Sequence, residues 1–105
     1  MENLTFRHRV AKPAGGTRKT AIAGVVASGN LEVLAERVLP GTECVVEIAT
    51  AAHGFGTVWE AVVADFVARR SPGGLRLSVN DGGARPDTVA LRLAQAQRLI
   101  EEDAP

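Results

Sequence analysis

The chain has 105 residues, with 12 basic and 12 acidic side chains and a formal net charge of zero. This length is near the usual size of one domain and too short for two separate cores, so we expect a single domain over residues 1–105. The balanced charge gives no reason to expect nucleic acid or an anionic membrane as a partner, and no apolar stretch reaches the roughly 20 residues of a membrane span. The first residues lack the apolar core of a secretory signal, which predicts a cytoplasmic protein.

The first 20 residues are basic, with five lysines or arginines against Glu2 alone. Residues 4–10 alternate apolar and polar side chains and predict a short edge strand, and residues 12–17 are typical of a loop. Because basic runs are usually solvated, we interpret residues 1–20 as a solvated, flexible segment; the alternative is a patch that contacts phosphate or another subunit.

Three further strands are predicted between residues 21 and 50. Residues 21–27, 31–38 and 43–50 are rich in apolar and β-branched side chains, and the short turns 28–30 and 39–42 join them. The second turn contains Pro-Gly, which fixes one φ angle and leaves the next free to be positive. Connections this short favour an antiparallel meander.

The hydrophobic period changes after residue 54. Apolar side chains then recur at the spacing of an amphipathic helix, at Phe55, Trp59, Val62, Val63, Phe66 and Val67. The run Ser-Pro-Gly-Gly at residues 71–74 ends this helix, and residues 75–80 alternate as a half-buried strand before a turn at 81–83. Pro86 begins a last helix, whose apolar stripe is Val89, Leu93, Ala96 and Ile100.

These elements follow the order β-β-β-β-α-β-α. Neither helix can bury its apolar stripe alone, so we expect both to pack on one face of a mostly antiparallel sheet. The predicted fold class is therefore α+β.

The enzyme-like fragments of the sequence are each incomplete. Residues 15–20 resemble part of a phosphate-binding loop, but they lack its Gly-Lys-Thr order and precede a strand instead of following one. His53 lies at a strand-to-helix junction without a partner for a triad, which favours a role for residues 53–56 in starting the helix. Cys44 is the only cysteine and takes an inward position, typical of a core side chain, and two scattered histidines do not predict a transition-metal site.

Ser28, Gly29 and Asn30 form the tip of the first predicted hairpin. The turn places a serine hydroxyl in an exposed position beside two residues that tolerate a positive φ. As a pattern alone it predicts only a turn.

The segment around this serine, AGVVASGNLEVL at residues 23–34, resembles the modification segment of the malonate decarboxylase acyl carrier (delta subunit) family. It is similar, more distantly, to the acyl carrier subunit of citrate lyase. A second segment, NDGGARP at residues 80–86 with ALRL at 90–93, is similar to the Asp-x-Gly-Ala turn and arginine-bearing helix of both carriers. Length and element order agree too, so the resemblance covers nearly the whole chain.

The resemblance implies a non-catalytic carrier. In such a carrier, Ser28 is joined through a phosphodiester to 2'-(5''-phosphoribosyl)-3'-dephospho-CoA, an arm that ends in a thiol and that a separate phosphoribosyl-dephospho-CoA transferase attaches. An acyltransferase subunit exchanges acetyl for malonyl on this thiol, and decarboxylase subunits release carbon dioxide and restore the acetyl thioester.

Several residues take roles through this resemblance. Gly29 leaves room for an approaching triphosphate, and Asn30 stands where these families usually have aspartate. Asp81, Arg85 and Arg92 are the supporting residues, with a structural role favoured for Asp81 because an aspartate beside Gly-Gly commonly bonds its own turn.

Three classes of function stay open on the sequence. The first is the malonate decarboxylase carrier, with the citrate lyase carrier as its close alternative. The second is a binding or assembly module whose hairpin is unmodified, and the third is a free-standing enzyme that uses His53 or Ser28.

Overall fold

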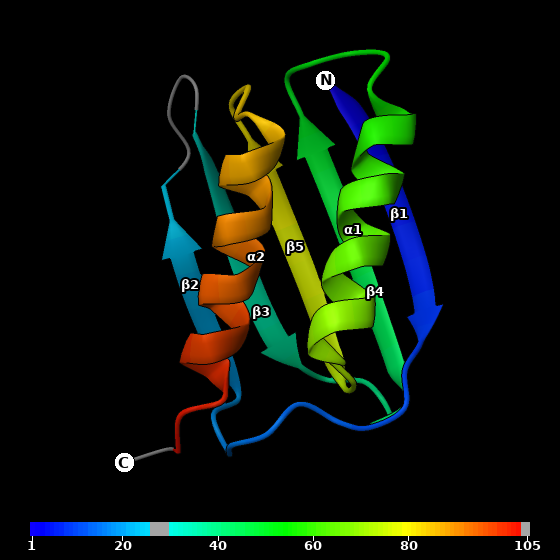
Figure 1. Ribbon diagram of the computed structural model, residues 1–105. Coiled ribbons are helices and arrows are strands. Elements are labelled where there is room, and N and C mark those ends of the chain that lie inside the picture. Colours follow the sequence, from blue (N-terminus) through cyan, green and yellow to red (C-terminus); the bar gives the residue numbers. More distant parts are fainter. Residues whose placement is uncertain (26–29, 104–105) are drawn as a thin grey trace.

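The computed structural model describes residues 1–25 and 30–103 (Figure 1). In chain order its elements are β1 (Glu2–Arg9), β2 (Thr20–Gly24), β3 (Leu31–Arg37), β4 (Glu43–Thr50), α1 (Gly56–Arg70), β5 (Leu75–Asp81) and α2 (Pro86–Ile100). The predicted order of strands and helices is confirmed, and so is the α+β class with a mostly antiparallel sheet.

The strand order in the sheet is β1-β4-β5-β3-β2. The hairpin partners β2 and β3 pair antiparallel, with Ile22 opposite Leu34. β3 and β4 are not neighbours, because β5 lies between them, antiparallel to β3 and parallel to β4. The predicted meander through residues 21–50 is therefore wrong at its second connection.

The physical reason lies in the connections on both sides of β4. Two strand spacings are roughly 10 Å, which the few residues between β3 and β4 can span past the end of β5. Helix α1 then carries the chain back along the sheet, so that β5 enters parallel to β4. The Pro-Gly turn correctly indicates a reversal of direction, but turn chemistry does not specify which strand becomes the neighbour.

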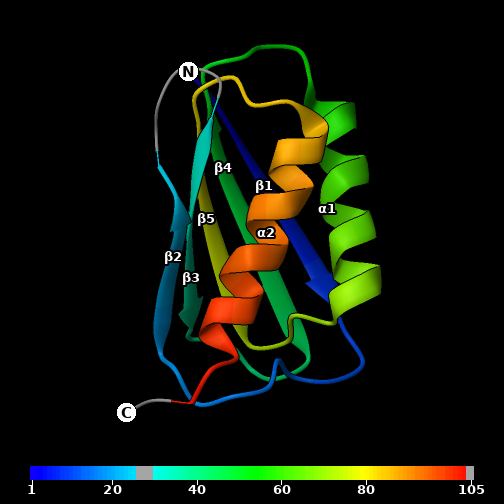
Figure 2. The same cartoon turned by 60° about the vertical axis from the view of Figure 1, so that its left-hand side comes forward.

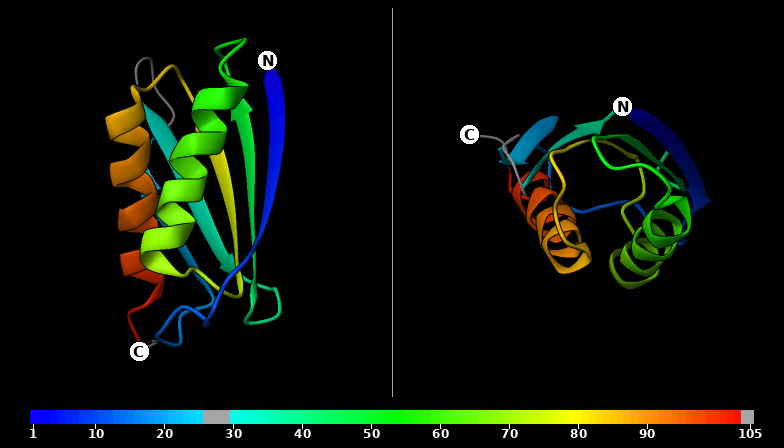
Figure 3. Two further views of the ribbon diagram at one scale, coloured as in Figure 1. Left: turned by 45° about the vertical axis from the view of Figure 1, so that its right-hand side comes forward. Right: turned by 90° about the horizontal axis from the view of Figure 1, so that it is seen from above.

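Both helices cover one face of the sheet, α1 on the side of β1 and α2 on the side of β2 and β3 (Figures 2 and 3). The core between the layers combines alternate strand residues with the two helical stripes. Its largest buried side chains include Leu31, Leu75, Leu77, Trp59, Phe66, Leu93 and Ile100. Period-2 burial in the strands and a helical stripe on each helix thus meet in one core, as the sequence predicts. Phe55 is the exception in the first predicted stripe, because it precedes α1 and is 52% exposed.

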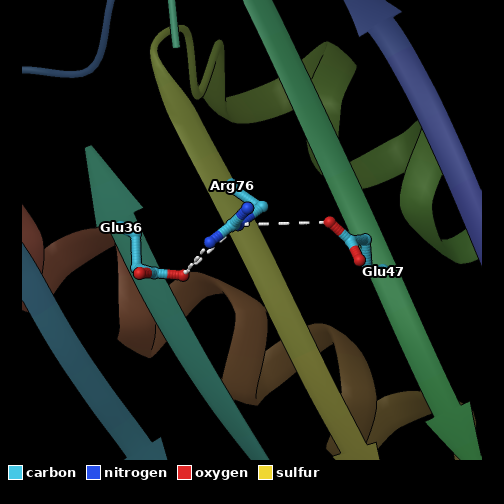
Figure 4. A network of polar contacts seen from close by, with 3 residues as sticks. All are labelled: Glu36, Glu47 and Arg76. Atoms are coloured by element: carbon cyan, nitrogen blue, oxygen red, sulfur yellow. Dashed lines mark hydrogen bonds and ion pairs between the residues drawn. The ribbon is translucent and has the colours of Figure 1, made fainter. Parts of the chain in front are cut away.

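The opposite face of the sheet carries a charged cluster, shown in Figure 4. Arg76 of β5 lies between Glu36 of β3, at 3.0 Å, and Glu47 of β4, at 4.0 Å. The hydrogen bond and the charge of Glu36 raise the pKa of Arg76 above its ordinary value. The cluster bridges three adjacent strands on the solvent side, where ion pairs contribute little to stability.

Arg37, at the end of β3, joins the basic N-terminal segment to the rest of the fold. Its guanidinium donates hydrogen bonds of 2.8 to 2.9 Å to the carbonyl oxygens of Ala14, Gly15 and Arg18. It also donates to the carbonyl of Ile100, at the end of α2, at 2.9 Å. One side chain therefore holds the loop between β1 and β2 against the end of the last helix.

We expect Arg37→Ala to lower the free energy of unfolding by about 2 kcal/mol. Hydrogen bonds from a charged group contribute roughly 1.5–3 kcal/mol each, but these carbonyls lie near solvent and water replaces part of the loss. Arg37→Lys should recover little, because an ammonium does not reproduce the planar fork. Urea unfolding measures both variants. Arg98→Ala, on the exposed side of α2, is the control, and an equal loss there would contradict the role of Arg37.

Candidate functional site at one end of the sheet

One end of the sheet collects the residues that the sequence analysis singles out. β2, β4 and β5 end there, and β3, α1 and α2 begin there, at the upper end in Figure 1. Gly24 closes β2, and Asn30 directly precedes β3. Ser28 and Gly29 lie outside the described residues, so the structure describes the base of the predicted hairpin and not its tip.

Asn30 holds this base against the turn that follows β5. Its Oδ1 accepts a hydrogen bond of 2.8 Å from the N–H of Leu31, and its carbonyl accepts one of 2.7 Å from the N–H of Gly82. An asparagine side chain that bonds nearby backbone is typical of turns. The two segments that carry the family resemblance, far apart in the sequence, are therefore bonded to each other.

Asp81 organises the turn after β5 and is only 5% exposed. Its Oδ1 accepts a hydrogen bond of 2.8 Å from the N–H of Ala84, and its Oδ2 accepts one of 2.8 Å from Oγ1 of Thr50. The Thr50 oxygen accepts in turn from the N–H of Ala52 at 3.1 Å. Asp81 thus bonds its own turn and also joins the ends of β4 and β5.

Arg92 of α2 lies against the other side of the hairpin base. A Cβ atom at Gly24 would lie 2.9 Å from both Cδ and Nε of Arg92, and Gly24 has a φ of +81°. The same Cβ would overlap the backbone carbonyl oxygen of Leu31, so only glycine combines this backbone conformation with room for that carbonyl and the arginine. Nη1 of Arg92 donates to Gln95 at 2.7 Å, while its Nε is buried without a hydrogen-bond partner among the described residues.

Arg85 has a different environment. It caps the start of α2 with extended backbone, its side chain is 85% exposed, and its Nε lies 3.7 Å from Oδ1 of Asp87. The three candidate supporting residues therefore share one end of the fold but have different partners. Asp81 bonds backbone and Thr50, Arg92 lies beside Gly24, and Arg85 is open to solvent.

A groove of about 260 Å³ opens between the first turns of α1 and α2. Its walls are almost wholly apolar and come from both helices, from the connection between β4 and α1, and from the end of β5 with the turn after it: Ala52, Phe55, Val58, Trp59, Val62, Asp81, Gly83, Ala84, Pro86 and Val89. Phe55 and Val58 are 52% and 42% exposed, so the rim of the groove faces solvent.

His53 and Cys44 have opposite surroundings. His53 is exposed, and Gly54 after it has a φ of +83°, which turns the chain toward the start of α1. Cys44 is 1% exposed, and burial raises the pKa of its thiol to about 12. Within residues 1–25 and 30–103, no three His, Cys, Asp or Glu side chains form a metal-binding group, and no helix is long and apolar enough to cross a membrane.

Burial of Cys44 predicts a loss of stability at high pH. The folded chain holds the thiol proton more tightly than the unfolded chain, because the folded pKa of about 12 exceeds the ordinary value of 9.0. The stabilisation is complete below pH 9 and is lost as the pH rises toward 12. We expect the free energy of unfolding to fall more steeply over this range than in Cys44→Ala, as measured by urea unfolding. Parallel pH profiles would contradict this.

Sequence reasoning missed Thr50 and the groove. The bond between Thr50 and Asp81 depends on the parallel pairing of β4 and β5, which places these two residues opposite each other. A polar residue that ends an apolar strand is a signal for such a bond, but it does not name the partner. The groove depends on both helices beginning at the same end of the sheet.

The fold and this end define a class of protein. It is a small α+β domain that holds the base of a serine-bearing hairpin beside an arginine and an apolar groove, without an assembled catalytic group among the residues that the structure describes.

Comparisons with known proteins identify the family. The protein-family model for the malonate decarboxylase delta subunit (MdcD) matches residues 18–100 of this chain. The chain is 67% identical over 103 residues to the malonate decarboxylase acyl carrier protein of Bradyrhizobium diazoefficiens, covering 98% of each chain. It is 52% identical over 101 residues to that of Xanthomonas campestris pv. campestris, covering 96% of each.

A solved structure supports the same family. It is a chain from the crystal structure of a Pseudomonas malonate decarboxylase hetero-tetramer in complex with malonate, with a TM-score of 0.83 and 33% identity. The match covers 95% of this chain and 99% of that one. The chain belongs to the malonate decarboxylase acyl carrier protein family.

Proposed function

We propose that Ser28 carries a phosphoribosyl-dephospho-CoA arm, whose terminal thiol bears acetyl and malonyl thioesters during malonate decarboxylation. The observation that carries this proposal is the bond between the carbonyl of Asn30 and the N–H of Gly82, at 2.7 Å. It fixes the described base of the serine turn to the turn after β5, and it joins the two segments that resemble the carrier families. Membership of the malonate decarboxylase acyl carrier family supports acetyl and malonyl as the groups that the arm carries.

The residues beside the hairpin fit such an arm. Its attachment phosphate is an anion, and charge-assisted hydrogen bonds from a guanidinium to a phosphate are among the stronger ones in proteins. Arg92 offers a buried Nε that has no partner among the described residues, next to the strand that leads into the serine turn. We therefore propose that Arg92 supports the phosphodiester and that Arg85, at the exposed start of α2, meets a partner subunit.

Attachment requires a separate transferase. A serine hydroxyl is a weak nucleophile without a base, and neither the amide of Asn30 nor the guanidinium of Arg92 can take its proton. In the transfer, Oγ of Ser28 forms a bond to the α-phosphorus of a triphosphate-bearing precursor. The bond to the leaving group breaks, pyrophosphate departs, and the hydroxyl proton passes to a base of the transferase.

The remaining partners are the acyltransferase and decarboxylase subunits. The similar chain from a hetero-tetramer supports assembly with such subunits. This chain performs no chemical step in the proposed cycle. It moves the thioester between active sites, and the tether keeps the effective concentration of the thioester high at each of them.

An intact mass and peptide map of the chain from its native host tests the proposal. Cells should grow on malonate and express the transferase. A Ser28 peptide that carries phosphoribosyl-dephospho-CoA is the expected result, and a malonyl group on its thiol distinguishes this carrier from that of citrate lyase. An unmodified Ser28 would overturn the proposal and favour a binding module.

A further inference from the structure

The proposed function gives no role to the apolar groove between α1 and α2. It has a volume of about 260 Å³, just below the range of about 300–1,000 Å³ of pockets for drug-sized ligands, so it suits a short chain of atoms. Among the described residues that line it, Asp81 is the one charged side chain, and both of its carboxylate oxygens are already bonded. The groove therefore favours an uncharged, apolar occupant.

The groove is continuous with the base of the serine hairpin. Gly83 and Ala84 form one of its walls, and the N–H of the preceding Gly82 donates to the carbonyl of Asn30. The strands that lead to these residues, β3 and β5, are hydrogen-bonded neighbours, roughly 4.8 Å apart. The groove therefore lies one turn away from Asn30, the described residue that follows the serine turn in the sequence.

From this arrangement we infer that the groove is a resting site for the thiol end of the carrier's own arm, in its free or acetylated form. The inference rests on the proposed function, since it requires the arm on Ser28. The methylenes, sulfur and acetyl group at the end of the arm are short and apolar, as the groove requires. A malonyl group adds a carboxylate, which would lose hydration in a groove without a lining cation.

The selectivity follows from this difference in charge. The acetyl thioester rests against the carrier, shielded from water and from other thiols. The malonyl thioester stays in solvent, where the decarboxylase subunits reach it. The groove thus distinguishes the two states of the arm by their solvation alone.

Two features of the sequence make a direct experiment practicable. Trp59 lines the groove and is the only tryptophan, so intrinsic fluorescence reports on this site. Cys44 is the only cysteine and is buried, so an aromatic disulfide reagent titrates the thiol of the arm in the folded chain. The transferase first loads the arm onto the full chain, and intact mass confirms the loading.

We expect the free thiol of the loaded chain to react about fivefold more slowly than that of dephospho-CoA in solution, because only the fraction outside the groove reacts. Ala84→Leu and Ala52→Leu each place a larger side chain in the groove and should restore the solution rate. Ala61→Leu, exposed on α1 and outside the groove, is the matched control and should leave the slow rate unchanged. Trp59 emission should differ from the unloaded chain in the acetyl form but not in the malonyl form.

The other outcomes overturn the inference in distinguishable ways. A loaded chain with the solution rate and unchanged Trp59 emission would leave the proposed function intact and remove the resting site. Equal emission changes for acetyl and malonyl would contradict the apolar selection. An emission change that requires an added acyltransferase or decarboxylase subunit would assign the groove to that partner. A chain that the transferase cannot load would overturn the proposed function and this inference together.

Discussion

Ser28→Ala is expected to abolish loading of the arm and, with it, malonate decarboxylation by the reassembled complex. The loss should be complete, because one oxygen atom forms the phosphodiester and its removal leaves no bond to make. The fold should be retained, with a change in the free energy of unfolding within about 0.5 kcal/mol, as for a surface substitution. Intact mass after incubation with the transferase measures loading, and carbon dioxide release measures turnover.

A matched control separates the hydroxyl from general effects of the substitution. Ser78 lies in the middle of β5, away from the end of the sheet that holds the hairpin. Ser78→Ala should load and turn over as the native chain does. If Ser28→Ala still gained the mass of the arm, attachment would be at another residue, and if it turned over without the arm, the carrier proposal would fail.

The element order could be predicted from the sequence because it depends on local periodicity. Leu93 and Ile100, from the predicted apolar stripe of α2, face the core in the structure. Leu75 and Leu77, the apolar residues of the alternating segment in β5, face it too. These patterns indicate which side of each element is buried, because burial depends on the hydrophobicity of the side chains themselves. The predicted placement of both helices on one face follows from the same requirement.

Strand order could not be predicted in the same way. The short turn through Pro40 and Gly41 is compatible with a hairpin and equally with a step across one strand, since both reverse the chain. The strand order is decided by β5, which follows α1 in the chain and pairs with both β3 and β4. That is a long-range preference, and no residue near the turn encodes it.

In the candidate site too, local features could be predicted from the sequence and long-range contacts could not. Its segments could be identified from their residues, but not the contact between Asn30 and Gly82 or the position of Arg92 beside Gly24. Both contacts depend on strand pairing and helix packing between residues far apart in the sequence. The four carbonyl contacts of Arg37 are a similar case, because an arginine at the end of a strand carries no sign of its partners.

Asp81→Ala is expected to lower the free energy of unfolding by about 4 kcal/mol. It removes two short hydrogen bonds to a carboxylate, which contribute roughly 1.5–3 kcal/mol each, and it leaves the hydroxyl of Thr50 buried without its acceptor. Urea unfolding at neutral pH measures the loss. Asp65→Ala, which removes an exposed carboxylate paired with Arg69, is the control and should cost less than about 1 kcal/mol.

Asp81→Asn tests the contribution of the bond to β4 separately from that of the bond within the turn. An asparagine keeps one oxygen, which can still accept from the N–H of Ala84, but its amide nitrogen cannot accept from the hydroxyl of Thr50. We expect a loss of about 2 kcal/mol in Asp81→Asn and a larger loss in Thr50→Val, which also removes the acceptor of the Ala52 N–H. The double variant should lose about as much as Thr50→Val alone, because both single variants remove the same charge-assisted bond. Additive losses would mean that Asp81 and Thr50 act separately. In that case the turn would hold the hairpin base through Gly82 without help from β4.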